Sequence, residues 1–440
     1  AIARDAGDRP AEAGQLGHLG FCYSSLGDHR QAIDLHTQAL AIARDAGDRH
    51  GESSSLGALA YCYSSLGDHR KAIDLHTTAL AIARDTGNRH LQAAQLGHLA
   101  IYYSISGDYR QAIDLHAQAL AIAHETGDRQ FQALQLGNLA GCYSFSGDYR
   151  QAIDLHAQGL AIARDTGDRP AEAHQLGNLG MCYFSLGDYR QAIDLHAQAL
   201  AIARDMGDSR LEGHQLGNLA LCHVFLGDYR QAIDLQAQVL AIADGTGNRL
   251  HKAGLLGSVA NCHVFMGEYD QALNLYDQAL AIARDMGAME SVVNSLPGLA
   301  RAHLQLGDPA AALTVLAQHR GPYPGAEPAI RLVEALALLE LHCDAEGVRT
   351  FSGALAAADD QLALGDTNVA ALQVRVLALS GLAVATGDPA KAAAAVSAFT
   401  SARNATSAVG VAADSRRLLK LIAPHDQTGI LAEAGFPHEP

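Results

Sequence analysis

The sequence predicts an all-α fold in which pairs of helices stack into a solenoid. Three observations point to this class. A phrase of the type GDYRQAIDLHAQALAIARD recurs every forty residues from position 27 to position 227, with looser copies from 267 and 307. Each unit holds two stretches with helical spacing of apolar residues, and capping signals separate the two stretches. Because one such unit cannot bury its apolar faces alone, neighbouring units must stack.

The two helical stretches of a unit differ in the width of their apolar face. In the first stretch Leu176, Leu179 and Tyr183 follow spacings of three and four, which place them on one side. In the second stretch Ala192 and His196 belong to a broader apolar stripe. The broader stripe suits a helix that packs against two neighbours.

The ends of these helices are also marked. Asp188 followed by Gln191 has the form of a capping box, and the pattern recurs in other copies, including Asp228. Gly207 stands where a helix would end in a left-handed residue. Pro170 suits the first turn of the helix that follows. The unit is therefore predicted to be helix–turn–helix.

The run N-L-G-x-C-Y-x-x-L-G-D-Y-x-x-A-I-x-L-x-x-x-A-L at 178–200 resembles a tetratricopeptide repeat. The small and large residues that match the packing positions of that family are Leu179, Gly180, Tyr183, Gly187, Ala192 and Ala199. The forty-residue period is similar to that of kinesin light chain-like repeats. The resemblance implies an α-α superhelix of antiparallel helix pairs.

The repeats define the expected domain organisation. Residues 1–9 are predicted to be the end of a truncated repeat helix, and residues 10–320 about eight repeats. Residues 321–325 form a linker in this interpretation. Residues 326–440 are interpreted as degenerate helical repeats that end in a C-terminal cap.

Charge and cysteine content limit the partners and the compartment. The net charge is −16, and the acidic surplus is spread over the repeats, which argues against nucleic acid or an anionic membrane as partner. No segment is long and apolar enough to predict a membrane span. Six of the seven cysteines occupy one repeat position, which predicts reduced core thiols and a cytoplasmic location.

The copies differ most along one stripe of the first helix, opposite the face of Leu176 and Leu179. Constant packing beside one variable surface predicts a binding surface. The family resemblance implies that this surface lines a concave groove for a protein or peptide ligand. The predicted groove consists of variable residues at four slots of the first helices, namely Phe21, Tyr61, Ile101, Ile105, Phe145, His174, Met181, Phe184, His214, Leu221, Val224, Phe225, Val264 and Phe265. The alternative is that some of these side chains pack between adjacent repeats.

A constant glycine faces the same way in six copies, at Gly57, Gly97, Gly137, Gly177, Gly217 and Gly257. Glycine in a helix interior costs about 1 kcal/mol of helix stability. Two explanations are open at this point. The glycine could admit close approach of a ligand backbone, or it could have been copied by duplication without a function.

No catalytic, cofactor or metal motif emerges. The phosphate-binding loop G-x-x-x-x-G-K-[ST] and the zinc motif H-E-x-x-H are absent from the sequence. Adjacent pairs such as Cys222–His223 point about 100° apart on a helix and so form no metal half-site alone. His342, Cys343 and Asp344 are the only suggestive cluster for an enzyme, and their adjacency along the chain is poor geometry. We expect no enzymatic activity, no cofactor and no metal.

Five histidines, namely His36, His76, His116, His156 and His196, recur in the apolar stripe of the second helix. The simplest interpretation is an imidazole that fills an aromatic slot. A sharper hypothesis is that these neutral histidines make the array acid-sensitive, because protonating a buried imidazole is costly.

The favoured function is a binding module, the ligand-sensing or partner-recognition arm of a larger bacterial signalling protein. The truncated start, the near-identical repeats and the divergent helical tail resemble the C-terminal repeat arms of STAND-class signalling NTPases. That resemblance implies a covalently linked NTPase region upstream of residue 1. The alternative is a self-assembly scaffold, a homo-oligomer without a separate ligand.

Overall fold

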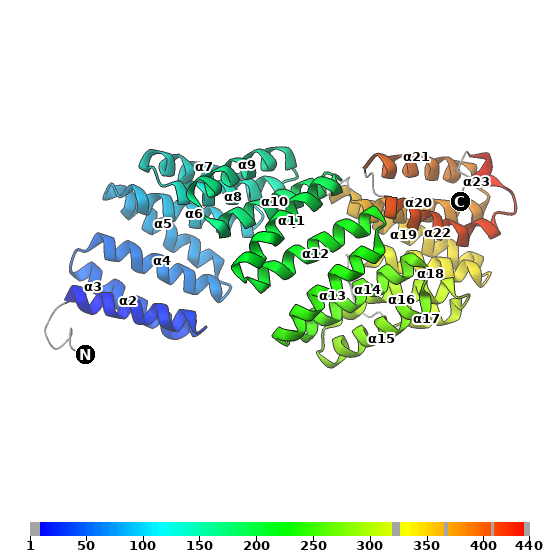
Figure 1. Cartoon of the computed structure of the whole chain (residues 1–440), viewed down its shortest axis with the longest axis horizontal. Coiled ribbons are helices and arrows are strands. Elements are labelled where there is room, and N and C mark those ends of the chain that lie inside the picture. Colours follow the sequence, from blue (N-terminus) through cyan, green and yellow to red (C-terminus); the bar gives the residue numbers. More distant parts are fainter. Residues whose placement is uncertain (1–8, 319–325, 365–367, 406–408, 435–440) are drawn as a thin grey trace. The chain divides into compact units, whose positions relative to one another are not determined.

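A computed structural model describes residues 9–318, 326–364, 368–405 and 409–434 of the chain, and these residues are almost entirely helical (Figure 1). They form α-helices α2 to α23 and one short 3-10 helix, and no strand occurs among them. The predicted linker 321–325 and nearly all of the predicted helix end at 1–9 lie outside the described residues. None of the helices in the described part of the chain combines the length and the apolar character that a bilayer crossing requires.

Helices α2 to α17 alternate between a first and a second member of each repeat. The first helices are α2 (Arg9–Ser25), α4 (Arg49–Ser65), α6 (Arg89–Ile105), α8 (Arg129–Phe145), α10 (Arg169–Ser185), α12 (Ser209–Leu226), α14 (Arg249–Met266) and α16 (Met289–Gln305). The second helices are α3 (His29–Asp45), α5 (His69–Asp85), α7 (Tyr109–Thr126), α9 (Tyr149–Thr166), α11 (Tyr189–Met206), α13 (Tyr229–Thr246), α15 (Tyr269–Asp285) and α17 (Pro309–Leu316).

The remaining helices follow without the repeated phrase. They are α18 (Glu327–Glu340), α19 (Asp344–Leu364), α20 (Val369–Thr386), α21 (Pro389–Ala405), α22 (Val409–Ile422), the 3-10 helix η1 (Ala423–His425) and α23 (Ile430–Glu433). They are fully packed: Leu336, Leu377 and Ile422 are buried in the same apolar cluster as Leu296 of α16. The C-terminal helices therefore continue the core of the last repeats.

The chain forms two compact units, residues 1–182 and residues 183–440. In the first unit the cores are small and extend from one repeat to the next, as with Leu136 of α8, Leu155 of α9 and Cys182 of α10. In the second unit one large cluster extends from α14 to α23. Neighbouring helices lie side by side within each unit (Figure 1).

The predicted helix ends are confirmed in most copies. The carboxylate of Asp188 accepts a hydrogen bond from the backbone N–H of Gln191 at 3.1 Å, as an N-cap should. Gly207 ends α11 with φ of 67°, a left-handed conformation that glycine adopts without strain. The prediction is wrong at Asp228, whose side chain makes no capping bond.

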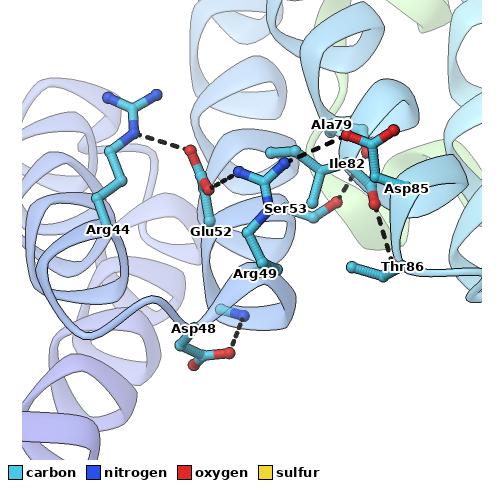
Figure 2. A network of polar contacts seen from close by, with 10 residues as sticks. Arg44, Asp48, Arg49, Glu52, Ser53, Ala79, Ile82, Asp85 and Thr86 are labelled. Carbon is cyan, nitrogen blue, oxygen red and sulfur yellow. Dashed lines mark hydrogen bonds and ion pairs between the residues drawn. The ribbon is translucent and has the colours of Figure 1, made fainter.

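Ion pairs join successive repeats at the start of the first helices. Glu52 on α4 accepts hydrogen bonds from Arg44 at the end of α3 (2.9 Å) and from Arg49 one turn away (2.7 Å). Arg49 also lies 3.6 Å from Asp85 at the end of α5. Figure 2 shows Arg49 between the two carboxylates. The same figure shows Ser53, whose hydroxyl donates to the carbonyl of Ala79 at 3.1 Å. Polar contacts thus fix the position of α4 against both of its neighbours.

Candidate binding surface

The predicted groove residues divide by exposure into three groups. Exposed side chains are Phe21, Tyr61, Ile101, Ile105, Phe145, His174, Met181, His214 and Leu221. Phe184, Val224, Phe225 and Phe265 are half-buried, and Val264 is buried. The face of the first helices that carries these fourteen residues is called the first-helix stripe below.

Val264 is a correction to the predicted groove. Its side chain is 3% exposed and belongs to the core cluster of the second unit, so it offers no surface to a ligand. Residues at this slot point toward the first helix of the next repeat. In the first unit Ser24 at this slot lies 3.1 Å from the sulfur of Cys62, and Ser144 lies 3.3 Å from that of Cys182. A larger residue at the slot is therefore covered by its neighbour.

The half-buried aromatic residues of the second unit pack against one another. The rings of Phe184 and Phe225 meet edge to face with centroids 5.1 Å apart, and both contact Tyr189. Phe265 packs against Tyr229 with centroids 5.2 Å apart. Such pairs stabilise the fold by about 1 kcal/mol beyond burial. Phe184, Phe225 and Phe265 thus pack between repeats, as the alternative interpretation proposed.

The exposed apolar residues of the stripe cluster instead in the first unit. Phe21 and Phe145 are 69% and 72% exposed, which is high for rings of that size. Tyr61, Ile101 and Ile105 continue the row on the intervening helices. Large apolar side chains that gather on one exposed face mark a contact surface more often than scattered ones do.

A buried hydrogen-bonded pair lies beneath the stripe at four successive junctions between repeats. At each junction the Nδ1 of a second-helix histidine donates to the side-chain oxygen of a glutamine on the next first helix. The pairs are His76–Gln95 at 2.6 Å, His116–Gln135 at 2.8 Å, His156–Gln175 at 2.7 Å and His196–Gln215 at 2.8 Å. All eight side chains are buried. The histidines do fill the predicted core slot, and they also hold a partner in the next repeat.

The constant glycine of the stripe makes room for that glutamine. A Cβ at Gly137 would lie 2.8 Å from the amide nitrogen of Gln175, and a Cβ at Gly97 would lie 3.0 Å from that of Gln135. Both distances are shorter than ordinary side-chain contacts. Neither explanation offered from the sequence holds at these two positions, because the glycine admits a side chain of the chain itself.

Hollows open along the stripe at junctions where the glutamine slot holds another residue. The α2–α4 hollow has a volume of about 560 Å³, and Ser55 occupies the slot there. The α12–α14 hollow measures about 590 Å³, with Leu255 at the slot. The α14–α16 hollow measures about 540 Å³, with Ser295 at the slot. All three junctions thus lack the glutamine that lies between adjacent first helices at the paired junctions.

Stripe residues line these hollows. Phe21 and Tyr61 line the α2–α4 hollow, together with His36 at its floor. His214 lines the α12–α14 hollow. The variable slots were visible in the sequence, but the hollows were not. Each hollow depends on whether a glutamine of the next repeat reaches the first helix of the preceding repeat. The signal that could have found them is the change of that glutamine to Ser55, Leu255 and Ser295.

Burial sets the protonation of the core histidines. Desolvation lowers the pKa of His76 to about 4, although the hydrogen bond that His76 donates to Gln95 raises it and the stacked ring of His98 lowers it further. The same desolvation lowers the pKa of His116 and His156 against a smaller opposing effect of their glutamines. These imidazoles are therefore neutral at pH 7.

The structure brings together no catalytic or metal-binding group in the residues that it describes. No cluster of three or more His, Cys, Asp or Glu there could hold a metal ion. In the stretch 342–344, His342 turns toward His425, with ring centroids 5.6 Å apart, and the thiol of Cys343 is exposed. Burial raises the pKa of Cys222 and of Cys262 to about 12, so these thiols are unsuited to nucleophilic chemistry.

Comparison with known proteins identifies the repeat. The sequence model of the tetratricopeptide repeat matches residues 12–85, 90–165, 131–205, 171–245, 211–285 and 251–320, which together span more than half of the chain. No curated protein matches the sequence.

Two of the solved structures compared show the same type of fold. A STAND protein with a tetratricopeptide repeat sensor from Pyrococcus horikoshii is 16% identical, with a TM-score of 0.57 over 76% of this chain. The match covers 49% of that protein, so this chain spans about half of its length. Aspartyl phosphate phosphatase F from Bacillus subtilis is 14% identical, with a TM-score of 0.50 over 78% of this chain and 93% of that one. A putative kinesin light chain from Podosopora anserina with nearly identical repeats is 24% identical, with a TM-score of 0.40 over 45% of this chain and 97% of that one.

Proposed function

The chain belongs to the tetratricopeptide repeat family, and we propose that it binds a protein or peptide ligand along the first-helix stripe. The observation that carries the proposal is the row of exposed apolar side chains in the first unit, namely Phe21, Tyr61, Ile101, Ile105 and Phe145. Burying a large apolar side chain contributes roughly 2 kcal/mol, so a row of five contributes roughly 10 kcal/mol against an association cost of roughly 4–15 kcal/mol. The α2–α4 hollow adjoins this row at Phe21 and Tyr61.

The test is capture of a partner by the whole chain and by a stripe variant. Tyr61→Asp with Phe145→Asp places two charges on the exposed row without touching the core. Thr37→Asp with Ala117→Asp serves as the matched control, because both residues are exposed on second helices. We expect a partner retained by the parent and by the control to be lost from the stripe variant. Equal retention by all three proteins would exclude the stripe as the binding surface.

The wider role that we propose is that of a sensor or partner-recognition arm in a larger bacterial signalling protein. The fold similarity to a STAND protein with a repeat sensor supports this proposal. Its direct check is the coding sequence upstream of residue 1, which should encode a phosphate-binding loop. A cytoplasmic location belongs to the same proposal, and the free buried cysteines fit a reducing compartment.

A self-assembly scaffold is the second candidate, because the same exposed row could join two copies of the chain. Sedimentation equilibrium separates the two functions. A mass that rises with protein concentration in the parent, and not in the stripe variant, would favour the scaffold. Tetratricopeptide repeats are in general scaffolds without catalytic activity, and we propose that this chain is no exception.

A further inference from the structure

We propose that the α2–α4 hollow binds the side-chain carboxamide of a glutamine in the ligand, in the place that a glutamine of the chain itself fills at the following junctions. This inference rests on the proposed peptide-binding function and names what the first part of the stripe recognises. It concerns one hollow, that between α2 and α4 above α3.

The paired junctions define what the site accepts. At the junction of α6, α7 and α8, the carboxamide of Gln135 lies between two groups. His116 donates to its oxygen at 2.8 Å, and Gly97 leaves room beside its nitrogen. At a later junction the amide nitrogen of Gln175 donates to the carbonyl of Ala133 at 3.2 Å. The histidine, the glycine and the backbone thus form a cradle for a carboxamide.

The first junction keeps the cradle and lacks the occupant. His36 and Gly17 stand at the histidine and glycine slots, whereas Ser55 stands at the glutamine slot. A Cβ added at Gly17 would meet nothing within 4 Å, in contrast to Gly97 and Gly137. The space that Gln135 and Gln175 fill elsewhere is therefore open here.

His36 is a buried polar group that faces the open space. Its side chain lines the hollow although the residue is only 5% exposed. Within the described residues no hydrogen bond joins its ring to another group, unlike the four paired histidines. A Cβ at Gly20 would lie 2.7 Å from the ring, so glycine at this position lets α2 approach His36 closely. The His36 ring is therefore held in place, and its nitrogens make no hydrogen bond to the residues that the structure describes.

The other two hollows lack this feature. At the α12–α14 hollow Gln236 replaces the histidine, and at the α14–α16 hollow Tyr276 replaces it and donates its hydroxyl to Asn261 at 2.6 Å. The α2–α4 hollow is thus the one of these three that retains both His and Gly of the cradle.

The lining favours a neutral ligand group. No lysine or arginine lines the hollow, and Asp48 is its one carboxylate. A carboxylate ligand would therefore find no lysine or arginine and would face the like charge of Asp48. Ser54 and His36 offer hydrogen bonds, and the exposed rings of Phe21 and Tyr61 flank the space. A carboxamide on a short apolar stem matches this combination of groups.

The direct test uses N-acetylglutamine methylamide as the probe and the full chain labelled with isotopic carbon in histidine. We expect a saturable shift of the His36 ring resonance at a probe concentration on the order of millimolar, as suits so small a ligand. The methylamides of N-acetylmethionine and N-acetylglutamate are the matched probes, which have the same two backbone amides and no side-chain carboxamide. Equal shifts with all three probes, or no shift with the glutamine probe, would overturn the proposal.

Two variants make the test specific to the cradle. Ser55→Gln should restore the His36–glutamine pair, fill the hollow and abolish the response without loss of stability. Gln95→Ser should open the equivalent space beside His76 and give that histidine a new response to the same probe. A response that survives Ser55→Gln contradicts the proposal, and so does a His76 resonance unmoved in folded Gln95→Ser.

The same variants separate this inference from the broader function. If Ser55→Gln still captures the partner that Tyr61→Asp with Phe145→Asp loses, the stripe binds a ligand and the carboxamide site is wrong. If the glutamine probe binds but no partner depends on the stripe, the site stands and the proposed function fails.

Discussion

Lys252 on α14 donates to Asp244 at the end of α13, with its Nζ 2.9 Å from the carboxylate oxygen. The same two slots hold arginine and glutamate in other repeats, as in Arg164–Glu172 at 2.9 Å and Arg204–Glu212 at 2.8 Å. The signs of the two charges are exchanged at residues 244 and 252 while the attraction remains. At these three junctions the two charges are opposite, and either helix can carry either sign.

Reversal of one charge should destabilise this junction, and reversal of both should restore it. Lys252→Glu places a carboxylate beside Asp244, and we expect a loss of roughly 0.5–1 kcal/mol, since both side chains are partly exposed. Asp244→Arg combined with Lys252→Glu recreates the arginine–glutamate pair of the other copies. Urea unfolding of the two single variants and the double variant measures the coupling.

Salt provides the control for the charge-reversal experiment. The differences between variants should shrink at high ionic strength, because screening weakens an exposed pair. If the change in the free energy of unfolding of the double variant equals the sum of the changes in the two single variants, the pair contributes nothing to the junction.

Acid should destabilise the first unit through its buried histidines. Burial lowers the pKa of His76 to about 4 in the folded chain, below the ordinary value of 6.5. The unfolded chain therefore binds more protons between these two values, and stability falls as the pH drops below about 6.5. At pH 5.5 the loss should reach about 1 kcal/mol for His76 alone. Urea midpoints at pH 7.5 and 5.5 test this expectation.

His76→Gln isolates that contribution. Gln236 occupies the equivalent slot on α13, so the repeat accepts this side chain. The variant should lose part of the pH dependence of its urea midpoint. A midpoint that is the same at both pH values in the parent would exclude the acid-sensitive array.

The helices could be predicted from the sequence because each depends on nearby residues. Leu176 and Leu179 share a face by local spacing, and Asp188 caps a helix three residues away. Periodicity within one helix carries this information. The family followed from the same residues.

The details of the binding surface depend on contacts between repeats, which periodicity within one helix does not encode. Val264 and Leu221 both lie on the variable stripe, yet the first is buried by the next repeat and the second is 40% exposed. The partner of His116 lies nineteen residues away on another helix. Helical spacing predicts on which side of its own helix a residue lies. It does not predict whether the neighbouring helix buries that side.

Alanine at the constant glycine should have opposite effects at two copies. A Cβ at Gly217 meets nothing within 4 Å, so Gly217→Ala should stabilise the chain by roughly 0.5–1 kcal/mol through helix propensity. At Gly137 the same Cβ would displace the amide of Gln175, which bonds both His156 and Ala133. Gly137→Ala should therefore gain less stability or lose some. Thermal unfolding of the two variants side by side provides the comparison. Equal stabilisation would show that the Gln175 side chain can move aside without a loss of folding stability.

Thiol labelling should separate the seven cysteines into two groups. Cys22 and Cys343 are exposed, whereas the other five are buried. For Cys262, burial raises the pKa to about 12 from 9.0, which lowers the thiolate fraction about a thousandfold. Native protein at pH 8 should therefore react rapidly with Ellman's reagent at two thiols, and the remaining thiols should react only after denaturation. Cys22→Ala and Cys343→Ala should each remove one rapid equivalent. More than two rapid equivalents in the native parent would mean that the junctions between repeats open on the timescale of labelling, because the reagent reaches the buried thiols only when adjacent first helices separate.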